Sequence, residues 1–165
     1  MTYVEGFVLA VPTANRQAYL DHATSAVAFL KEFGVARMVE NWGDDVPAGT
    51  LNDFAKAVQA TADETIVFSW FEYPDRAARD AASARMMTDP RMEAMGASMP
   101  FDGSRMIYAG FQAEVEEGSA AGTGYVDGFI LPVSPANKDA YFAMARSASA
   151  AFLENGAIRV VETWG

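Results

Sequence analysis

The stretch YVEGFVL at residues 3–9 decides the fold, because it recurs as YVDGFIL at residues 125–131. The match continues without a gap at the same offset, and about half of the aligned positions are identical. Further matched pairs are Tyr19 and Tyr141, Gly34 and Gly156, Glu40 and Glu162, and Trp42 and Trp164. Chance does not produce such a match over roughly forty residues. The chain is therefore one module followed by the first third of a second copy.

This repeat sets the expected domain organisation. We expect a complete module over residues 1–117, a linker over 118–123 and a partial second module over 124–165. The stretch EEGSAAGTG at residues 116–124 is small and polar, as flexible linkers are. A complete second module would need roughly 75 further residues, so the repeat predicts a tandem protein of about 240 residues.

The order of predicted elements indicates the fold class. Stretches rich in β-branched and aromatic residues predict strands, and apolar residues three and four apart predict helices. The predicted strands are 3–11, 35–42, 65–73 and 105–115, and the predicted helices are 14–33, 52–60 and 75–87. An irregular Met-rich stretch separates the last helix from the last strand. The order βαββαβ is that of an α+β, ferredoxin-like module, followed by an extra βαβ half-module.

The strands carry apolar residues on both sides. In strand 65–73, alternation places Val67 and Phe71 on one face, and Ile66, Phe68 and Trp70 on the other. Helices cover one face of a ferredoxin-like sheet, so the other face needs an apolar partner. The pattern predicts face-to-face pairing with another module, either as a homodimer or as a pseudo-dimer within the chain.

Composition and charge exclude several classes of protein. Twelve Lys and Arg against 22 Asp and Glu give a net charge of −10, which is unsuited to nucleic acid. No apolar run approaches the roughly 18–20 residues that span a bilayer, and no signal peptide is recognisable. The absence of cysteine excludes disulfides and thiolate ligands. We expect a cytoplasmic protein that binds neither nucleic acid nor membrane.

Several longer motifs point to a family. They are DDVP at 44–47, DETIVFSW at 63–70, RAARD at 76–80, DPRM at 89–92 and MPFDGSRMIY at 99–108. With the opening strand, they make the chain resemble the YbaA-like family, a domain of unknown function (DUF1428). The likeness covers residues 1–117 end to end, and 124–165 over the family's first third. It implies a dimeric α+β barrel fold and supplies no activity.

Glu40 and Trp42 are the main candidate site residues. They lie two apart on a predicted strand, so they share a face with Met38, and both recur in the second copy. A carboxylate on an apolar strand face would act as a general base with a raised pKa in a barrel cavity. The alternative is a carboxylate at the rim that bonds a nearby arginine or a loop backbone.

Other ligand-binding candidates are Trp70, Arg105, Tyr108 and Met86. Arg105 follows the turn that begins at Asp102, and it would grip a ligand carboxylate or form a structural ion pair. Met86 opens a run of methionines that would line a pocket for an apolar ligand or fill the core.

No metal or cofactor is expected. His22 is the only histidine, and its counterpart Met144 suggests that it fills space. Asp44 and Asp45 precede Val46 and a proline, a pattern typical of turns rather than metal ligation. No Gly-rich phosphate loop or nucleophile elbow is present.

Three functions remain open. The first is a binding module whose cavity holds a small apolar molecule or a carboxylate. The second is a cofactor-independent oxygenase or isomerase, by analogy of fold. The third is a self-assembly protein. A solvent-excluding cavity that contains Glu40 would favour the enzyme, and a dry cavity without carboxylates would favour binding. We also expect two chains to pair their half-modules, or each half-module to dock on a partner's complete module, because its edges are unpaired.

Overall fold

The computed structural model describes residues 1–119 and 124–165. The chain divides into two compact units, residues 2–110 and residues 111–165 together with Met1. Most of the linker predicted at 118–123 lies outside the described residues, while Gly118 closes a strand. No helix in the described part of the chain is long and apolar enough to cross a membrane.

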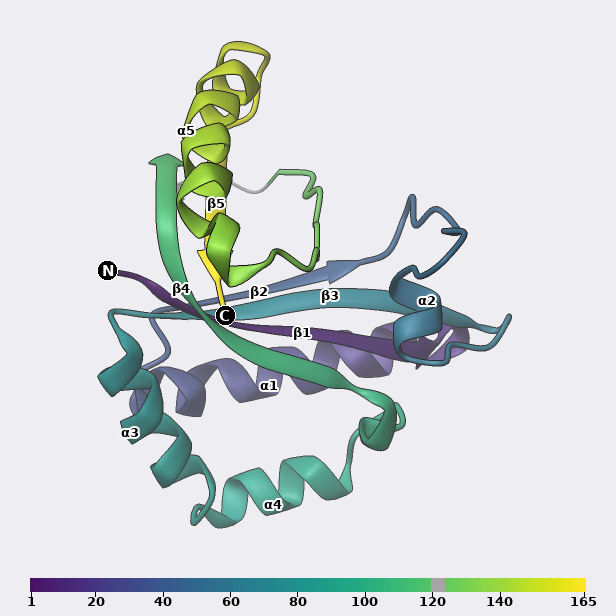
Figure 1. Cartoon of the computed structure of the whole chain (residues 1–165). Helices are drawn as coiled ribbons and strands as arrows, with labels where there is room; N and C mark the ends of the chain where they lie inside the picture. The colour runs from purple at the N-terminus through teal and green to yellow at the C-terminus, as the bar shows by residue number, and fades with distance from the viewer. Residues whose placement is uncertain (120–123) are drawn as a thin grey trace. The chain divides into compact units, whose positions relative to one another are not determined.

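The first unit has the predicted βαββαβ order (Figure 1). Its elements are β1 (Tyr3–Pro12), η1 (Thr13–Asn15), α1 (Arg16–Phe33), β2 (Arg37–Trp42), α2 (Phe54–Ala57), β3 (Glu64–Tyr73), α3 (Arg76–Met86), α4 (Pro90–Ala97), η2 (Gly103–Arg105) and the start of β4 (Ile107–Gly118). The strands follow the order β2-β3-β1-β4, with antiparallel β1–β3 and β2–β3 pairs. This confirms the α+β, ferredoxin-like class.

Local signals explain most helix boundaries. Gly34 ends α1 with a φ of +113°, a left-handed conformation that glycine adopts without strain. The Asp75 side chain caps α3 by accepting from the backbone N–H of Ala78. The prediction of an irregular Met-rich stretch is wrong in one part, because α4 forms there. Asp89 caps it and Pro90 occupies its first turn, a signal that was present in the sequence.

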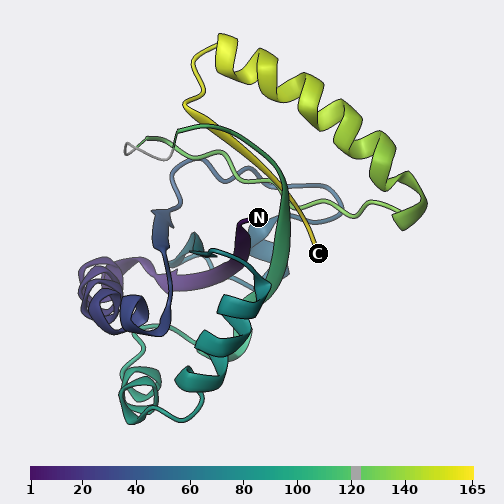
Figure 2. The same cartoon turned by 90° about the vertical axis from the view of Figure 1, so that its left-hand side faces the viewer.

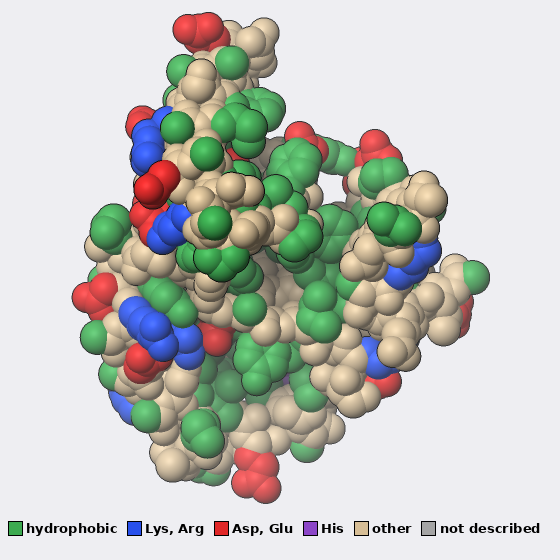
Figure 3. All heavy atoms as spheres, viewed as in Figure 1, with side chains coloured by type: hydrophobic (Ala, Val, Ile, Leu, Met, Phe, Trp, Pro, Cys, Tyr) green, Lys and Arg blue, Asp and Glu red, His purple; other side chains and the backbone are tan. Residues whose placement is uncertain are grey.

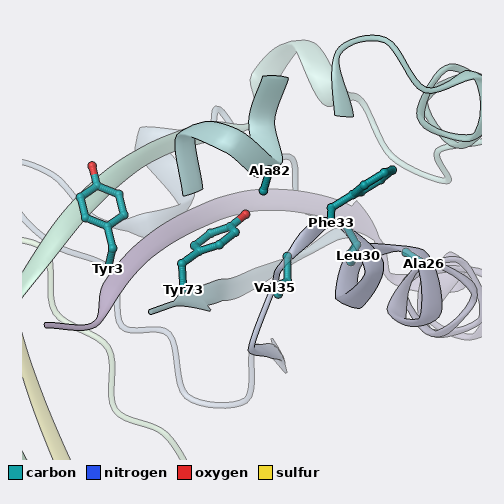
Figure 4. Close-up of a cluster of buried hydrophobic side chains, with 7 residues drawn as sticks. All are labelled: Tyr3, Ala26, Leu30, Phe33, Val35, Tyr73 and Ala82. Atoms are coloured by element: carbon teal, nitrogen blue, oxygen red, sulfur yellow. The ribbon is translucent and has the colours of Figure 1, made fainter. Parts of the chain in front are cut away.

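The core of the first unit lies between the sheet and α1 with α3. Its buried members are Tyr3, Ala26, Leu30, Phe33, Val35, Tyr73 and Ala82 (Figure 4). The other face of the sheet carries a smaller cluster, in which Val8, Ala10 and Ile66 pack against Val58. Phe54 of α2 packs there too, so this short helix covers part of the second face. Phe68 and Trp70 stay half-buried on that face, and face-to-face pairing of modules remains a prediction.

The second unit contains the rest of β4, η3 (Pro135–Asn137), α5 (Lys138–Glu154) and β5 (Arg159–Trp164). β4 and β5 pair antiparallel, and Val115 packs with Phe142 and Ala145 of α5. Residues 124–134 form neither helix nor strand, so the first strand predicted for the half-module is absent. A strand needs a neighbour for its backbone hydrogen bonds. β1 lies between β3 and β4, and residues 125–131 have no such neighbours among the described strands.

Candidate functional site

Glu40 lies at the centre of a polar cluster between α1 and β2. Its carboxylate accepts a hydrogen bond from the buried Tyr19 hydroxyl of α1. Ser69 of β3 is its cross-strand neighbour and a further hydrogen-bond partner. Trp42 packs on Tyr19 with ring centroids 6.2 Å apart, and Arg16 lies 5.6 Å from the centre of the Trp42 ring. We call these five residues the Glu40 cluster.

Burial dominates the electrostatics of Glu40. Loss of solvent raises the pKa of its carboxyl above the ordinary value of 4.5, and hydrogen bonds from Tyr19 and Ser69 oppose this shift. Burial also raises the pKa of Tyr19, and the neighbouring carboxylate adds to the effect. Tyr19 therefore acts as a hydrogen-bond donor, while Glu40 is the group in this pair that can exchange a proton.

A groove of about 400 Å³ runs between α1 and β2 next to this cluster. Aliphatic side chains form much of its lining, including Leu20, Ala23, Val27 and Met38, and Glu40 is the acidic residue among the lining residues. The groove is open to solvent, so the solvent-excluding cavity that would favour an enzyme is not present at this site. The lining also includes the basic residues Lys31 and Arg37. An open, largely aliphatic groove suits reversible binding better than water-free chemistry.

The second copy reproduces much of the Glu40 cluster. The Tyr141 hydroxyl donates to Glu162 at 2.7 Å, and burial raises the pKa of Tyr141 to about 12. Lys138, the counterpart of Arg16, places its ammonium nitrogen 5.3 Å from the centre of the Trp164 ring. A basic residue in this cluster was not predicted from the sequence. The positive charge at both Arg16 and its counterpart Lys138 could have indicated it.

Trp70 and Met86, two of the other predicted ligand-binding residues, lie away from the groove. Trp70 alternates with Ser69 and so lies on the opposite sheet face, where its indole donates to Glu72 at 2.9 Å. Met86 packs against the core beneath α3. The structure therefore brings Glu40 and Trp42 together and leaves these two elsewhere.

Arg105 and Tyr108 are also separate from the groove. The Arg105 guanidinium is held by Glu64 at 2.5 Å and by Asp102 at 2.9 Å, and this contact lowers the pKa of Glu64 to about 2. Tyr108 is 65% exposed and stacks on Phe7 with centroids 6.1 Å apart. Arg105 thus forms a structural ion pair rather than an open carboxylate site.

A second half-buried carboxylate, Glu5 on β1, was not predicted from the sequence. The Tyr73 hydroxyl lies 3.4 Å from it, and Arg79 hydrogen-bonds to the Tyr3 hydroxyl at 3.1 Å nearby. Burial raises the pKa of Glu5, and Arg79 opposes the shift. Strand alternation puts Glu5 on the face of the sheet that α1 and α3 cover. Only the packing of α3 on that face brings Arg79 close to Glu5.

His22, Asp44 and Asp45 lie outside the Glu40 cluster. His22 is partly exposed on α1, and desolvation lowers its pKa. Asp44 and Asp45 are exposed in the loop after β2. Within residues 1–119 and 124–165, no three His, Asp or Glu side chains gather closely enough to hold a metal ion.

Glu40 is expected to make the free energy of unfolding fall as the pH rises. Its folded pKa is raised, so its stabilising contribution is full below pH 4.5 and is lost as the pH rises through the folded pKa. Glu40→Gln removes this titration. The urea midpoint of the variant should therefore change less between pH 4.5 and about pH 7.5 than that of the wild type. Glu162→Gln is the control for the loss of a carboxylate elsewhere in the chain. If the urea midpoints of the wild type and of Glu40→Gln changed with pH by the same amount, the prediction would be contradicted.

Comparisons with known proteins identify the family. A family model described as a protein of unknown function (DUF1428) matches residues 2–103 and 124–165, and so includes both copies of the repeat. The uncharacterized protein YbaA of Escherichia coli K12 is 53% identical over 117 residues, which cover 71% of this chain and 100% of that protein.

Solved structures give weaker matches. A NIPSNAP domain protein from Burkholderia xenovorans matches with a TM-score of 0.44 and 16% identity, over 74% of this chain and 99% of that chain. A dimeric ferredoxin-like protein from an uncultured marine organism matches with a TM-score of 0.43 and 12% identity, over 66% of this chain and 90% of that chain. The family model and the full-length match to YbaA carry the assignment. This chain belongs to the DUF1428 family of proteins of unknown function.

Proposed function

We propose that the chain binds a small, largely apolar molecule that carries a hydroxyl or amine. The observation that carries this proposal is the placement of the Glu40 carboxylate in the lining of an aliphatic groove. The apolar part of the ligand lies along α1, where burial contributes about 25 cal/mol per Å² of apolar surface. The donor group of the ligand reaches Glu40.

Glu40 has hydrogen-bonding capacity left for such a ligand. A carboxylate offers about four acceptor positions, and Tyr19 and Ser69 use two of them. A ligand carboxylate next to Glu40 would be repelled when Glu40 is ionised. Of the two basic residues in the lining, Lys31 and Arg37, Arg37 is already paired with Glu72 at 2.8 Å. Arg105, the residue predicted to hold a carboxylate, is already engaged by Glu64 and Asp102. These contacts favour a donor-bearing ligand over an anionic one.

A cofactor-independent oxygenase or isomerase is the second candidate. The raised pKa of Glu40 favours it, because a base whose pKa lies nearer the working pH exchanges protons more effectively. In this alternative Glu40 removes a proton from a substrate that occupies the same groove. The openness of the groove to solvent supports binding over this second function.

Probes of equal chain length test the proposal. Hexanol, hexylamine and hexanoate are titrated into labelled protein, and backbone amide chemical shifts of α1 and β2 are followed by NMR. Hexanol and hexylamine should shift the groove residues, and hexanoate should bind at least about tenfold more weakly. Glu40→Gln should weaken hexylamine by about tenfold, while the matched Glu162→Gln should not. Equal affinity for all three probes, or an unchanged affinity of Glu40→Gln for hexylamine, would show that Glu40 does not take part in binding.

Native mass spectrometry of protein purified from cells identifies the natural ligand. A retained molecule with an apolar body and a hydroxyl or amine supports the proposal, and a retained anion contradicts it. Incubation of the identified molecule with the wild type separates the two functions. Conversion that disappears in Glu40→Gln while affinity persists would establish the enzyme, and unchanged ligand would establish binding.

A further inference from the structure

The groove between α1 and β2 has a filled counterpart in the second copy of the repeat. Leu20 of the groove lining corresponds to Phe142 of α5, and it is 38% exposed whereas Phe142 is 3% exposed. Ala23, also in the lining, corresponds to Ala145. Val115 of β4 packs against both Phe142 and Ala145, and is itself 5% exposed. The space that is open beside α1 is therefore occupied by a strand residue beside α5.

The strand that fills this space lies along one edge of β5. β4 and β5 run side by side, and α5 packs on the same pair of strands (Figures 1 and 2). Ser119 N donates to Ile158 O at 3.0 Å, so even-numbered residues of β5 direct their backbone groups to β4. Val115 lies opposite Glu162, the counterpart of Glu40. In the second copy, a strand thus runs directly beside the repeated carboxylate.

The corresponding edge of β2 has no strand next to it in the described part of the chain, where β2 ends the strand order. Gly43 N donates to Ile66 O at 2.8 Å, so odd-numbered residues of β2 direct their backbone groups to β3. Even-numbered residues of β2 correspond to even-numbered residues of β5. The backbone groups of Met38, Glu40 and Trp42 therefore point to the edge that β4 fills on β5. β2 offers the same backbone edge next to an open groove.

A basic side chain lies at the same place in both copies. Lys138 lies over the Trp164 ring, and its ammonium bonds the Glu114 carboxylate of β4 at 2.7 Å. Basic and acidic side chains are visible next to one another along α5 and β4 in Figure 3. Arg16, the counterpart of Lys138, is exposed over the Trp42 ring, and within residues 1–119 and 124–165 no carboxylate forms an ion pair with it. Arg16 is therefore available to an acidic residue of an incoming strand.

The dimensions of the groove suit a short strand. Its lining on α1 extends from Leu20 to Lys31, which is about 16 Å at 1.5 Å per helical residue. A strand covers this distance in about five residues at 3.3 Å per residue. β2 itself has six residues, and β4 uses residues 112–118 against β5. A segment of about five to seven residues therefore matches both the groove and the edge.

We propose that the α1–β2 groove and the outer edge of β2 bind an extended segment of a partner polypeptide, which adds a strand antiparallel to β2. The segment has the chemistry of Glu114 and Val115. It carries an acidic residue that pairs with Arg16, followed by an apolar residue that enters the groove beside Leu20. Hydrogen bonds to the backbone of β2 supply affinity, and the groove selects the apolar side chain. The inference rests on the repeat and stands apart from the small-molecule function, although both occupants use the same groove.

A peptide with the sequence of residues 111–119, FQAEVEEGS, blocked at both ends, is the probe. It is titrated into the labelled full chain and followed by NMR. Amides of α1 and β2 should shift with a dissociation constant of about 1 mM or below, whereas those of α5 and β5 should not, because β4 fills that site. Without peptide, the amide protons of Met38, Glu40 and Trp42 should exchange rapidly with solvent, and the peptide should protect them. No saturable shift, or slow exchange of these amides in the free chain, would overturn the inference.

Two N-methylated peptides separate strand addition from binding of an apolar side chain alone. Methylation of the Val115 nitrogen removes an N–H that faces the receiving strand, so it should weaken binding at least about tenfold. Methylation of the Glu116 nitrogen removes an N–H that faces away, and it should have little effect. Val115→Asp in the peptide should also weaken binding at least about tenfold, because it brings a charge into the groove. Equal affinity of the two methylated peptides would overturn the inference.

The Arg16→Gln variant tests the predicted ion pair. Glu114→Gln in the peptide should weaken binding to the wild type about two- to fivefold, and should have no further effect on binding to Arg16→Gln. Lys138→Gln is the matched control and should leave the affinity for the peptide unchanged. Equal effects of Arg16→Gln and Lys138→Gln would place the peptide on β5 and overturn the inference.

Hexylamine distinguishes this inference from the small-molecule function. It should compete with the peptide for the groove, but it should not protect the β2 amides from exchange, because it has no backbone groups to pair with the strand. A chain that binds hexylamine and not the peptide would overturn the inference and leave the small-molecule function standing. A chain that binds the peptide and not hexylamine would support the inference and contradict the small-molecule function.

Discussion

Replacing Phe33 with alanine is expected to lower the free energy of unfolding of the first unit by about 3–5 kcal/mol. Phe33 is 5% exposed and closes the core between α1 and the sheet. The substitution removes the ring and leaves a cavity that the neighbouring side chains fill only in part. It also removes the ring that Arg85 and Arg91 cover at 5.1 and 5.3 Å, a contact worth about 0.5–1 kcal/mol at such sites.

Urea unfolding monitored by far-UV circular dichroism measures the effect of Phe33→Ala. The repeat supplies a matched control, because Asn155 occupies the position of Phe33 in the second copy and is exposed. Asn155→Ala should change the free energy of unfolding by no more than about 0.5 kcal/mol. A loss below about 1 kcal/mol in Phe33→Ala would mean that α1 is not held by this core.

Replacing Tyr19 with phenylalanine is expected to lower the free energy of unfolding by about 1.5–3 kcal/mol at neutral pH. Tyr19 is 5% exposed, and its hydroxyl donates to a carboxylate that burial has already made costly to ionise. Without this donor, the pKa of Glu40 should rise further. The loss should therefore be smaller well below pH 4.5, where Glu40 is protonated in both the folded and unfolded states.

Tyr141→Phe is the matched control for Tyr19→Phe. The Tyr141 hydroxyl makes the same kind of bond to Glu162 at 2.7 Å, but Tyr141 is only partly buried. Solvent can replace part of the lost bond there, so the expected loss is below about 1 kcal/mol. Denaturation curves at two pH values, one on each side of pH 4.5, measure both variants. If the two variants lost the same free energy of unfolding, or if the loss in Tyr19→Phe did not depend on pH, burial would not be what strengthens the hydrogen bond between Tyr19 and Glu40.

Much of the fold could be predicted from the sequence because its signals are local. The alternation of Val67 with Phe68 showed that both faces of β3 are apolar, and the structure places these residues in separate clusters. Gly34 and the apolar stripe of α1 predicted where that helix ends and which side it buries. Helix α4 differs from the irregular stretch predicted at these residues, although Asp89 and Pro90 mark its start.

The candidate site was predictable only in part. Two-residue spacing on a strand placed Glu40 and Trp42 on one face, which the structure confirms. The contributions of Tyr19 and Ser69 depend on how α1 docks and on the register of β2 against β3. Arg105 shows the converse, because its charge suggested a ligand while its partner Glu64 lies far away in the sequence. Pairings across the sheet have no local signature.

The repeat separates what the sequence by itself determined from what the tertiary structure decided. The sequence determined the two copies, the βαββαβ order of the first copy and the alternation of apolar side chains, since these follow from side-chain type and spacing. Only the tertiary structure decided that YVEGFVL forms β1 while YVDGFIL at residues 125–131 forms no strand. A strand is completed by backbone hydrogen bonds to its neighbours, and β3 and β4 supply them to the first copy alone.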